Sequence, residues 1–440
     1  MSGIVGTVGT RPDAAVLNAM LQRLSHRGPD GRGLHLSEDA GFGHVRLAIV
    51  DPSDAGAQPM PSPDGRYVLA YNGELYNHQD FRPGLESRGV RFHGRSDTET
   101  LLWLLITYGE AILPRLNGIF AFAFQDIYSH TVLLARDPIG VKPLYYASDS
   151  TGRLLFASEI KALFVEGGID ARLNVDDLVE LFTFHFIAGE RTAFANVRQL
   201  LPGHALRHAS GQVSISKFWD GVDSARRPGG TDSVDRRLRL LLDEAVQRQL
   251  MADVPIGLKS SGDLDSGVVT ALAGRHGSRL PGFCFRDAAT GYDECEDAQR
   301  IGGQFGVAVA EARIQPDEIP SLLEKLTWHN DEPLPRPRHL ADYAVARQAR
   351  AAGLNVLLSG QGGDELFGGY ERYLDYAATM EASGDLTPLI LGQHEGALTS
   401  LRRISPSRAF SNPFRAWCAS DTNGLDLINR QLIGDQRTWL

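Results

Sequence analysis

The sequence has few cysteines, no basic run and no long apolar stretch. Its three cysteines (Cys284, Cys295 and Cys418) show neither CxxC nor histidine spacing, which predicts neither a disulfide framework nor a zinc site. The formal net charge of -10, without any basic stripe, argues against a nucleic-acid partner. No apolar run reaches membrane-spanning length, and the start lacks the basic and apolar regions of a signal peptide. We therefore expect a cytoplasmic protein with no membrane segment.

What is present indicates a globular chain of two domains, because 440 residues exceed one ordinary core. Short strands separated by turn residues fill the first half, and helical spacing interrupts them at residues 14–24 and 98–108. The pair Asn72-Gly73 predicts a hairpin turn, since both residues tolerate a positive φ. This mixture predicts an α+β domain in which helices pack on antiparallel sheets.

A polar stretch with Pro and Gly, FWDGVDSARRPGGTDSVD at 218–235, has the composition of a linker. Beyond it, helices alternate with short apolar strands. The helices are expected over 234–249, 266–275 and 296–305, and the strands over 254–258, 281–285, 307–314 and 354–360. Alternation of this kind predicts a parallel α/β sheet with ligands at the carboxyl ends of its strands. The predicted domains are therefore 1–217 and 236–440, joined by the linker at 218–235.

The first candidate functional residue is Ser2. The chain opens MSGIVGTVG, and a small residue after Met1 is normally uncovered when the methionine is trimmed. Ser2 would then carry a free α-amine beside its hydroxyl, which is a nucleophile with its own base. A thiol is a few per cent ionised at neutral pH and an alcohol effectively never, so a serine here is a weak nucleophile. Ser2 is open to three interpretations: a working nucleophile, a relic of one, or the start of a strand.

Further candidates follow at Arg46, Asn72, Gly73, Glu74 and Asp97. The fork of Arg46 suits a carboxylate, and the carboxylates of Glu74 and Asp97 suit an ammonium. The amide of Asn72 and the N–H of Gly73 suit an oxyanion hole. Together they fit an amino acid whose side-chain amide is cleaved. Taken singly, each charged residue is read more simply as a surface charge and the Asn-Gly pair as a turn.

As a set, these residues resemble the class II (amino-terminal nucleophile) glutaminase domain of asparagine synthetases. The matching stretches are LSHRGPDG (24–31), HVRLAIVD (44–51), YNGELYN (71–77) and SDTETLL (96–102). The resemblance implies an Ntn-hydrolase-like fold of stacked sheets. It also implies that glutamine is bound by Arg46, Asn72, Gly73, Glu74 and Asp97, and that catalysis uses Ser2, Asn72 and Gly73. The family carries cysteine at position 2, so Ser2 predicts a glutaminase that is inactive or slowed by orders of magnitude.

A second cluster is VPIGLKSSGDLDSG at 254–267, which reads as a strand, a turn and the start of a helix. Small residues there let backbone N–H groups approach a phosphate, although an N-capped turn is an equally simple interpretation. The stretch resembles the pyrophosphate loop of ATP-pyrophosphatase ligases, Ser-Gly-Gly-x-Asp-Ser. The resemblance implies an adenine nucleotide alpha hydrolase-like domain whose ATP-binding residues include Lys259, Ser261, Gly262, Asp263, Asp265, Ser266 and Phe285. Phe285 is also read as a core aromatic.

Three residues of this loop depart from the family pattern. Asp263 stands where the second glycine belongs and brings a like charge and a Cβ toward the pyrophosphate. Lys259 and Ser260 replace apolar residues expected where adenine packs. These departures predict weaker ATP binding, which Lys259 partly offsets electrostatically.

The third cluster, VLLSGQGGDELFGGY at 356–370, resembles the asparagine synthetase signature, as does NDEPLPRPRHLADYAVARQA before it. The resemblance implies that Ser359 and Gly360 touch the nucleotide. It implies that Asp265 and Asp364 hold Mg²⁺, for which carboxylates are the expected ligands. Gln361, on the acceptor side, stands where asparagine-making enzymes carry glutamate, which weakens aspartate as the acceptor.

The reaction implied by the family is glutamine + ATP + carboxylate → amide + glutamate + AMP + pyrophosphate, with aspartate as the default acceptor. Ammonia would pass inside the protein from Ser2 to the loop at 261–266. Relatives continue beyond DQRTWL (435–440) with a segment that carries a catalytic lysine. The chain is therefore expected to be incomplete or to receive that segment from another polypeptide, and a homodimer is also left open. Two rival functions are a natural-product amide or lactam synthetase that does not use glutamine, and a glutamine-binding pseudoenzyme.

Overall fold

The computed structural model describes residues 1–225, 233–277, 280–286, 294–334 and 338–371, with residues 429, 432, 433, 435 and 436 near the end. The chain divides into two compact units, one built on Met1–Arg226 and the other on Arg227–Tyr370. The middle of the predicted linker (226–232) and Cys418 lie outside the described residues, as do most of the last residues of the chain. The linker boundaries stay a prediction.

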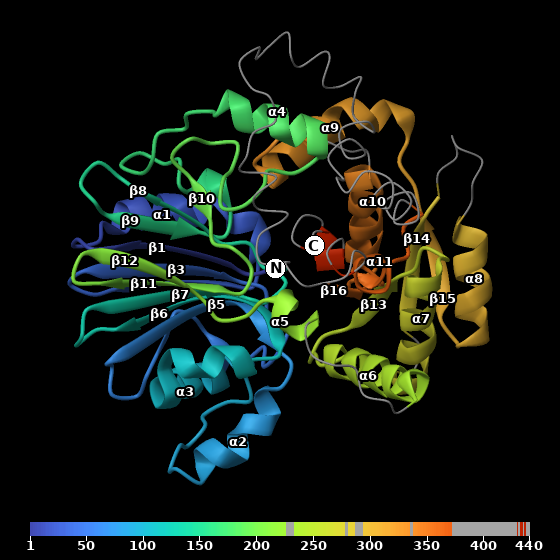
Figure 1. The fold of residues 1–440 in the computed structure, drawn as a ribbon, viewed down its shortest axis with the longest axis horizontal. Helices are drawn as coiled ribbons and strands as arrows, with labels where there is room; N and C mark the ends of the chain where they lie inside the picture. The colour runs from blue at the N-terminus through green and yellow to red at the C-terminus, as the bar shows by residue number, and fades with distance from the viewer. Residues whose placement is uncertain are drawn as a thin grey trace. The chain divides into compact units, whose positions relative to one another are not determined.

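Two six-stranded antiparallel sheets are stacked in the first unit (Figure 1). The first sheet consists, in spatial order, of β10 (Arg198–Gln199), β8 (Tyr145–Ser148), β9 (Leu154–Ala157), β1 (Gly3–Val8), β3 (Ala40–Arg46) and β2 (Gly31–Leu36). The second consists of β12 (Gln212–Lys217), β11 (His204–Ala209), β7 (Thr131–Arg136), β6 (Gly118–Asp126), β5 (Tyr67–Leu75) and β4 (Met60–Pro61). The predicted stacked antiparallel sheets are confirmed.

Helices cover the outer faces of both sheets. The helices of this unit are α1 (Ala14–Arg23), α2 (His78–Glu86), α3 (Asp97–Tyr108), α4 (Val175–Phe184) and α5 (Gly221–Ala225). Side chains alternate along β1, so that Ile4 joins the core between the sheets while Val5 packs with Leu17 of α1. On the far side, Leu101 of α3 packs with Phe122 of β6. The unit therefore has four layers, helix–sheet–sheet–helix.

The predicted turn at Asn72-Gly73 is wrong. Both residues lie inside β5, which pairs with β6 without interruption, Asn72 opposite Ala121 and Gly73 opposite Phe120. A Cβ on residue 73 would lie 2.3 Å from the carbonyl oxygen of Ile119, so glycine is needed for close approach of the backbones. Strand pairing in the folded protein overrides the local turn signal.

The second unit has a four-stranded parallel sheet in the order β15 (Ala308–Ala312), β14 (Pro281–Phe285), β13 (Ile256–Lys259) and β16 (Val356–Leu358). Its helices are α6 (Val234–Gln249), α7 (Leu264–His276), α8 (Glu294–Gln304), α9 (Ile319–Asn330), α10 (Arg338–Ala351) and α11 (Gly363–Phe367). The predicted parallel α/β domain is confirmed, and α6 and β14 have the predicted bounds. No helix in the described ranges is long and apolar enough to cross a membrane.

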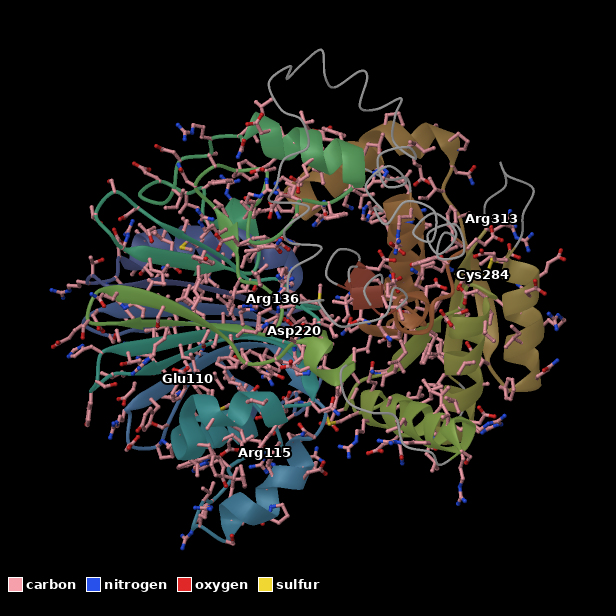
Figure 2. The ribbon with its side chains drawn as sticks, in the orientation of Figure 1. Glu110, Arg115, Arg136, Asp220, Cys284 and Arg313 are labelled. Carbon is pink, nitrogen blue, oxygen red and sulfur yellow. A yellow bond between two sulfur atoms is a disulfide. The ribbon has the colours of Figure 1, made fainter. Side chains whose placement is uncertain are left out.

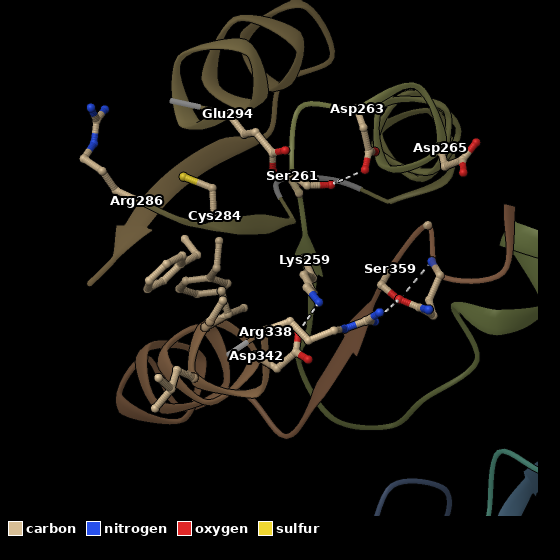
Figure 3. A pocket seen from close by; sticks show the side chains of 18 of the residues that line it. Lys259, Ser261, Asp263, Asp265, Cys284, Arg286, Glu294, Arg338, Asp342 and Ser359 are labelled. Carbon is tan, nitrogen blue, oxygen red and sulfur yellow. Dashed lines mark hydrogen bonds and ion pairs between the residues drawn. The ribbon is translucent and has the colours of Figure 1, made fainter. Parts of the chain in front are cut away.

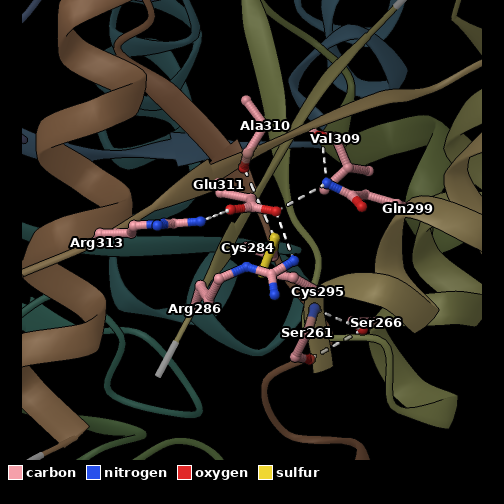
Figure 4. The surroundings of a disulfide bond; sticks show 10 residues. All are labelled: Ser261, Ser266, Cys284, Arg286, Cys295, Gln299, Val309, Ala310, Glu311 and Arg313. Atoms are coloured by element: carbon pink, nitrogen blue, oxygen red, sulfur yellow. Dashed lines mark hydrogen bonds and ion pairs between the residues drawn. A yellow bond between two sulfur atoms is a disulfide. The ribbon is translucent and has the colours of Figure 1, made fainter. Parts of the chain in front are cut away.

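Cys284 and Cys295 form a disulfide, so the expectation of no disulfide is wrong (Figure 4). Cys284 lies on β14 and Cys295 on α8, with their Cα atoms 5.5 Å apart. Side chains alternate along β14, so Phe283 packs with Val345 of α10 while Cys284 packs against α8. The fold of the unit, rather than any sequence spacing, brings the two cysteines together.

Candidate functional site

Ser2 immediately precedes β1, an interior strand of the first sheet. Its Oγ accepts a hydrogen bond from the N–H of Leu47 at 3.1 Å. Its carbonyl oxygen accepts one from Nε of Arg27 at 2.9 Å. While Met1 is attached, the nitrogen of Ser2 is a peptide nitrogen, so removal of Met1 is required before the α-amine can act as a base. Both the hydroxyl and the backbone of Ser2 are thus held in place.

Arg27, the residue that holds Ser2, is buried and balanced by a buried carboxylate. Nη1 of Arg27 lies 2.7 Å from Oε1 of Glu159, and Nε2 of His26 lies 3.0 Å from the same oxygen. Lys161 pairs with the other oxygen. Burial alone would raise the pKa of Glu159, but His26, Arg27 and Lys161 lower it to about 2. Sequence reasoning missed this network, although Arg27 lies in the LSHRGPDG stretch that it had singled out.

One edge of β5 presents an N–H where a ligand oxygen would need it. The N–H groups of Tyr71 and Leu75 point from this edge and donate to Oε1 of Gln58 at 2.6 Å and Oδ2 of Asp97 at 2.8 Å. Gly73 lies between them in the strand's period of two, so its N–H points the same way. No side chain or loop group among the described residues accepts it. This N–H is therefore open to a ligand, and its role as an oxyanion donor stays a prediction.

Two neighbouring side chains on β5 also lack partners. Nδ2 of Asn72 and Oε2 of Glu74 are buried and have no hydrogen-bond partner among the described residues. An unpartnered buried polar atom is costly, and such atoms are often found where a ligand completes the bonding. Here one atom is a donor and the other an acceptor. The pair suits a ligand that carries both a carbonyl oxygen and an ammonium group.

Asp97, the first residue of α3, is buried beside Glu74. It accepts hydrogen bonds from the hydroxyl of Tyr71 at 2.9 Å, the N–H of Leu75 at 2.8 Å and the N–H of Thr98 at 2.9 Å. Burial raises the pKa of Asp97 although these bonds oppose it. Burial and then the charge of Asp97 raise the pKa of Glu74 well above its ordinary value. The structure thus brings the two predicted acids together, and a ligand ammonium would favour their charged forms.

Lys142 is a buried cation of this site that sequence reasoning missed. Burial lowers its pKa to about 8, and the charge of Glu74 opposes that shift. The carboxylate of Asp137 accepts hydrogen bonds from the N–H groups of residues 139–142, which fixes the turn that presents the lysine. Arg136, labelled in Figure 2, donates to carbonyl oxygens of the same turn. An Asp-Pro-x-Gly turn after a strand was the available signal.

Arg46 is joined to a loop rather than to the other predicted residues. It ends β3, and its guanidinium donates to the carbonyl oxygens of Asp51 at 2.5 Å and Ser53 at 2.8 Å. The side chain therefore braces the chain that follows β3. A ligand carboxylate would have to share or replace these bonds, so the role of Arg46 in glutamine binding stays a prediction.

The second unit holds a cavity of about 850 Å³ at the carboxyl ends of its four parallel strands. Most of the predicted nucleotide residues line it, namely Lys259, Ser261, Asp263, Asp265, Phe285, Ser359 and Gly360, and so do the predicted metal ligand Asp364 and the acceptor-side residue Gln361. Gly262 and Ser266 do not. Gly262 bends the loop with a φ of 86°, and Ser266 is turned into the start of α7. The cavity has the place and the size expected of a nucleotide site in this fold.

Each departure from the family loop has a partner inside the chain, and Figure 3 shows those of Lys259 and Asp263. The sequence predicted that the charge of Lys259 would partly offset that of Asp263. In the structure Lys259 forms its ion pair with Asp342 of α10 and not with Asp263. The hydroxyl of Ser260 is buried 3.1 Å from that of Thr270 in α7. The polar group of Ser260 therefore faces the protein rather than the cavity.

Asp263 is the N-cap of α7. Its Oδ1 accepts a hydrogen bond from the N–H of Ser266 at 2.8 Å, and its Oδ2 accepts one from the hydroxyl of Ser261 at 2.8 Å. On the opposite wall, Oε1 of Gln361 accepts a hydrogen bond from Arg338 at 3.3 Å. Sequence reasoning had found no role for Arg338 or for the partner of Lys259.

Asp265 and Asp364 have the chemistry that Mg²⁺ requires. Both line the cavity, and burial and then the charges of Asp364, Asp263 and Glu365 raise the pKa of Asp265. The described residues contain no cluster of three or more ligating side chains arranged for a metal ion. Two carboxylates still fit Mg²⁺, because this ion commonly takes its remaining ligands from phosphates and water.

The fold and two family models together define the class: a glutamine amidotransferase-type domain followed by a parallel α/β domain of the asparagine synthase type. A family model for a glutamine amidotransferase domain matches residues 1–219, and one for asparagine synthase matches residues 237–439. The chain belongs to the asparagine synthetase family.

Two relatives illustrate the similarity. Asparagine synthetase [glutamine-hydrolyzing] 1 of Bacillus subtilis is 33% identical over 382 residues, which cover 85% of this chain and 59% of that protein. Amidase chyE of Penicillium rubens is 33% identical over 383 residues, covering 83% of this chain and 56% of that protein. The chain thus spans less than two thirds of the length of these relatives.

Among solved structures, a glutamine phosphoribosylpyrophosphate amidotransferase from B. subtilis in complex with ADP and GMP matches 82% of this chain and 91% of that chain. The identity is 16% and the TM-score 0.39, which is too low to support a functional conclusion.

Proposed function

We propose that this chain supplies the glutamine-binding and nucleotide-binding parts of an ATP-dependent ligase that converts a carboxylic acid into its amide with ammonia from glutamine. One observation carries the proposal: β5 presents two open donors, the N–H of Gly73 and Nδ2 of Asn72, beside the buried acids Glu74 and Asp97. The donors suit the side-chain carbonyl of glutamine, and the acids suit its α-ammonium. Glutamine is a small molecule that offers both groups.

In the first half-reaction, Oγ of Ser2 attacks the side-chain amide carbon of glutamine after Met1 has been removed. The α-amine takes the hydroxyl proton and returns it to the departing nitrogen, which leaves as ammonia. The N–H of Gly73 and Nδ2 of Asn72 stabilise the oxyanion of the tetrahedral intermediate. Water then cleaves the acyl-enzyme ester and releases glutamate. An alcohol is a much weaker nucleophile than a thiol in this step, so we expect slow turnover.

In the second half-reaction, the acceptor carboxylate attacks the α-phosphorus of ATP and releases pyrophosphate, and ammonia then displaces AMP from the acyl-adenylate. Asp265 and Asp364 would hold Mg²⁺, which neutralises phosphate charge when bound. Similarity to the asparagine synthetases supports aspartate as the default acceptor. Gln361, which stands where asparagine-making enzymes carry glutamate and accepts a hydrogen bond from Arg338, supports an acceptor other than aspartate.

Glutamine binding and glutamine turnover test the first half separately. We expect glutamine to raise the melting temperature of the wild-type chain, since a ligand that binds the folded state stabilises it. Glutamate release is expected to stay near background. Glutamate and α-ketoglutaramate, which lack the amide and the ammonium respectively, are matched control ligands. If glutamine stabilised the protein no more than these two compounds, the glutamine-binding role would be wrong.

A second candidate function is a glutamine-binding pseudoenzyme, which Ser2 and the carboxylate of Asp263 in the nucleotide loop both favour. ATP–pyrophosphate exchange measured across a panel of carboxylic acids separates it from the ligase. Exchange with any acid supports the ligase, and the acid that supports exchange identifies the acceptor. A lactam-type synthetase would exchange with an acid that carries its own amine and would ignore glutamine. Glutamine stabilisation without exchange for any acid would support the pseudoenzyme.

A further inference from the structure

The loop at the start of α7 already contains an anion that belongs to the protein. A phosphate bound here would need the helix N–H groups and the hydroxyl of Ser261 as donors. The carboxylate of Asp263 takes one of each: the N–H of Ser266 and the hydroxyl of Ser261, both at 2.8 Å. Both Asp263 and Ser261 line the cavity, and Figure 3 shows the two side chains directed toward each other. A ligand phosphate at this point competes with Asp263 for the same donors.

Among the described residues, no cationic side chain forms an ion pair with this carboxylate. Lys259, the lysine at the end of β13, is paired with Asp342. On the side of α8, burial and then the charge of Asp263 raise the pKa of Glu294, which lines the same cavity. Asp265, which would hold Mg²⁺ when the ion is bound, is not counted among these charges. Each phosphate added to a ligand brings more negative charge toward this group, so the penalty grows with the length of the phosphate chain.

We infer that the Asp263 carboxylate occupies the anion-binding position of this loop, where the hydroxyl of Ser261 and the N–H of Ser266 donate. The cavity therefore prefers a nucleoside monophosphate to a nucleoside triphosphate. The inference rests on the proposed nucleotide-binding role of the cavity. A monophosphate places no β- or γ-phosphate against the loop and leaves the bonds of Asp263 intact. A triphosphate must displace Asp263 from Ser261 and Ser266 and then remain beside it.

Titration calorimetry of the full-length chain with AMP, ADP and ATP, all in the presence of Mg²⁺, tests the inference. The variants are Asp263→Ser, which keeps an N-cap oxygen without the charge, and Asp263→Asn, which keeps the shape. Glu294→Gln is the matched control, since it removes a carboxylate from the same cavity that accepts no hydrogen bond from Ser261 or Ser266. In the wild type we expect AMP to bind at least as tightly as ATP. In D263S and D263N we expect the ratio of ATP affinity to AMP affinity to rise about tenfold or more, and in E294Q to change much less.

AMP binding shows whether each variant is folded, because AMP does not need the loop donors. An unchanged ratio in D263S and D263N would overturn the inference. An equal rise in E294Q would also overturn it, because the preference would then come from the net charge of the cavity rather than from the position of the Asp263 carboxylate. Tighter binding of ATP than of AMP by the wild type would overturn it as well. If none of the three nucleotides bound to any variant, both the nucleotide role of the cavity and the inference would be wrong. Binding of all three with an unmoved ratio would leave the proposed function standing and remove only the role of Asp263.

Discussion

The two units treat their departures from the family pattern in opposite ways. In the first unit, position 2 is changed, but the groups around it are buried and tightly bonded: Arg27 holds the carbonyl of Ser2, and Glu159 holds Arg27. In the second unit several positions are changed, and each has a local partner: Lys259 pairs with Asp342 at the cavity, Asp263 caps α7, and the hydroxyl of Ser260 is buried against that of Thr270.

The difference shows that a site can keep its geometry without keeping the chemical group that the reaction needs. A buried network keeps its geometry whatever atom stands at the point of attack, so the first site depends on the chemistry of one side chain. In an open cavity, a substituted polar side chain can pair with a neighbouring side chain, as Lys259 pairs with Asp342. The paired groups are then less available to bind a ligand. The first site is therefore expected to respond steeply to single changes and the second only weakly.

The steepest response is expected from Arg27→Met. This change removes one member of a buried ion pair and leaves the charged Glu159 with Lys161 and His26 alone; breaking a buried pair typically costs about 3–5 kcal/mol of folding free energy. Urea unfolding followed by circular dichroism measures the loss. Arg66→Met, which removes a more exposed pair with Asp126, is the control and is expected to change stability much less. Equal losses in the two variants would show that the network around Ser2 is no stiffer than the surface.

Ser2→Cys is expected to have the next largest effect. It supplies a nucleophile that is partly ionised at neutral pH, so glutamate release should rise by roughly 100-fold or more. Ser2→Ala, which removes the nucleophile but keeps the strand, is the control and should stay at background. A cysteine variant as slow as wild type would show that the surrounding groups are wrongly arranged, and the first site would then resemble the second.

The sequence predicted most where local pattern and fold agree. The helix α6 and the strand β14 have the bounds that periodicity predicts, and the glutamine-binding residues predicted at 72–74 are consecutive on β5. The turn at Asn72-Gly73 failed because the local preference of an Asn-Gly pair was overridden by pairing with β6 along the whole strand.

Contacts between residues far apart in the chain could not be predicted from the sequence. Arg27 and Glu159 are 132 positions apart, and Lys259 and Asp342 are 83 apart, so no local spacing links them. The disulfide between Cys284 and Cys295 depends on β14 and α8 packing side by side. Lys142 was missed because its significance comes from burial near Glu74 rather than from its neighbours in the chain.

Glu74→Gln and Asp97→Asn should change stability in opposite directions. The raised pKa of Glu74 means that the folded state favours its protonated form, so its contribution to stability is present below the ordinary value of 4.5 and is lost as pH rises through the raised value. At pH 8, E74Q should therefore be more stable than wild type by roughly 1–2 kcal/mol, and this gain should vanish toward pH 4. Asp97→Asn cannot accept all three of its hydrogen bonds and should be less stable by about 1–3 kcal/mol.

Both variants should lose stabilisation by glutamine, which separates function from folding. Thermal unfolding across pH 4–8 with and without glutamine measures all of these quantities together. If E74Q were destabilised at every pH, Glu74 would be a structural residue rather than a binding residue. The proposed contrast between the site of the first unit and the cavity of the second would then be wrong.

The smallest effect is expected from the pair in the cavity. Lys259 and Asp342 have side chains 34% and 42% exposed, so their ion pair should contribute about 0.2–1 kcal/mol, and less at high salt. A double-mutant cycle with Lys259→Met and Asp342→Asn, measured by urea unfolding at low and high salt, isolates this coupling. A coupling as large as that of the Arg27–Glu159 pair would mean that the cavity is built as rigidly as the first site. Lys259 and Asp342 would then be part of a rigid binding site rather than a weak, partly exposed pair.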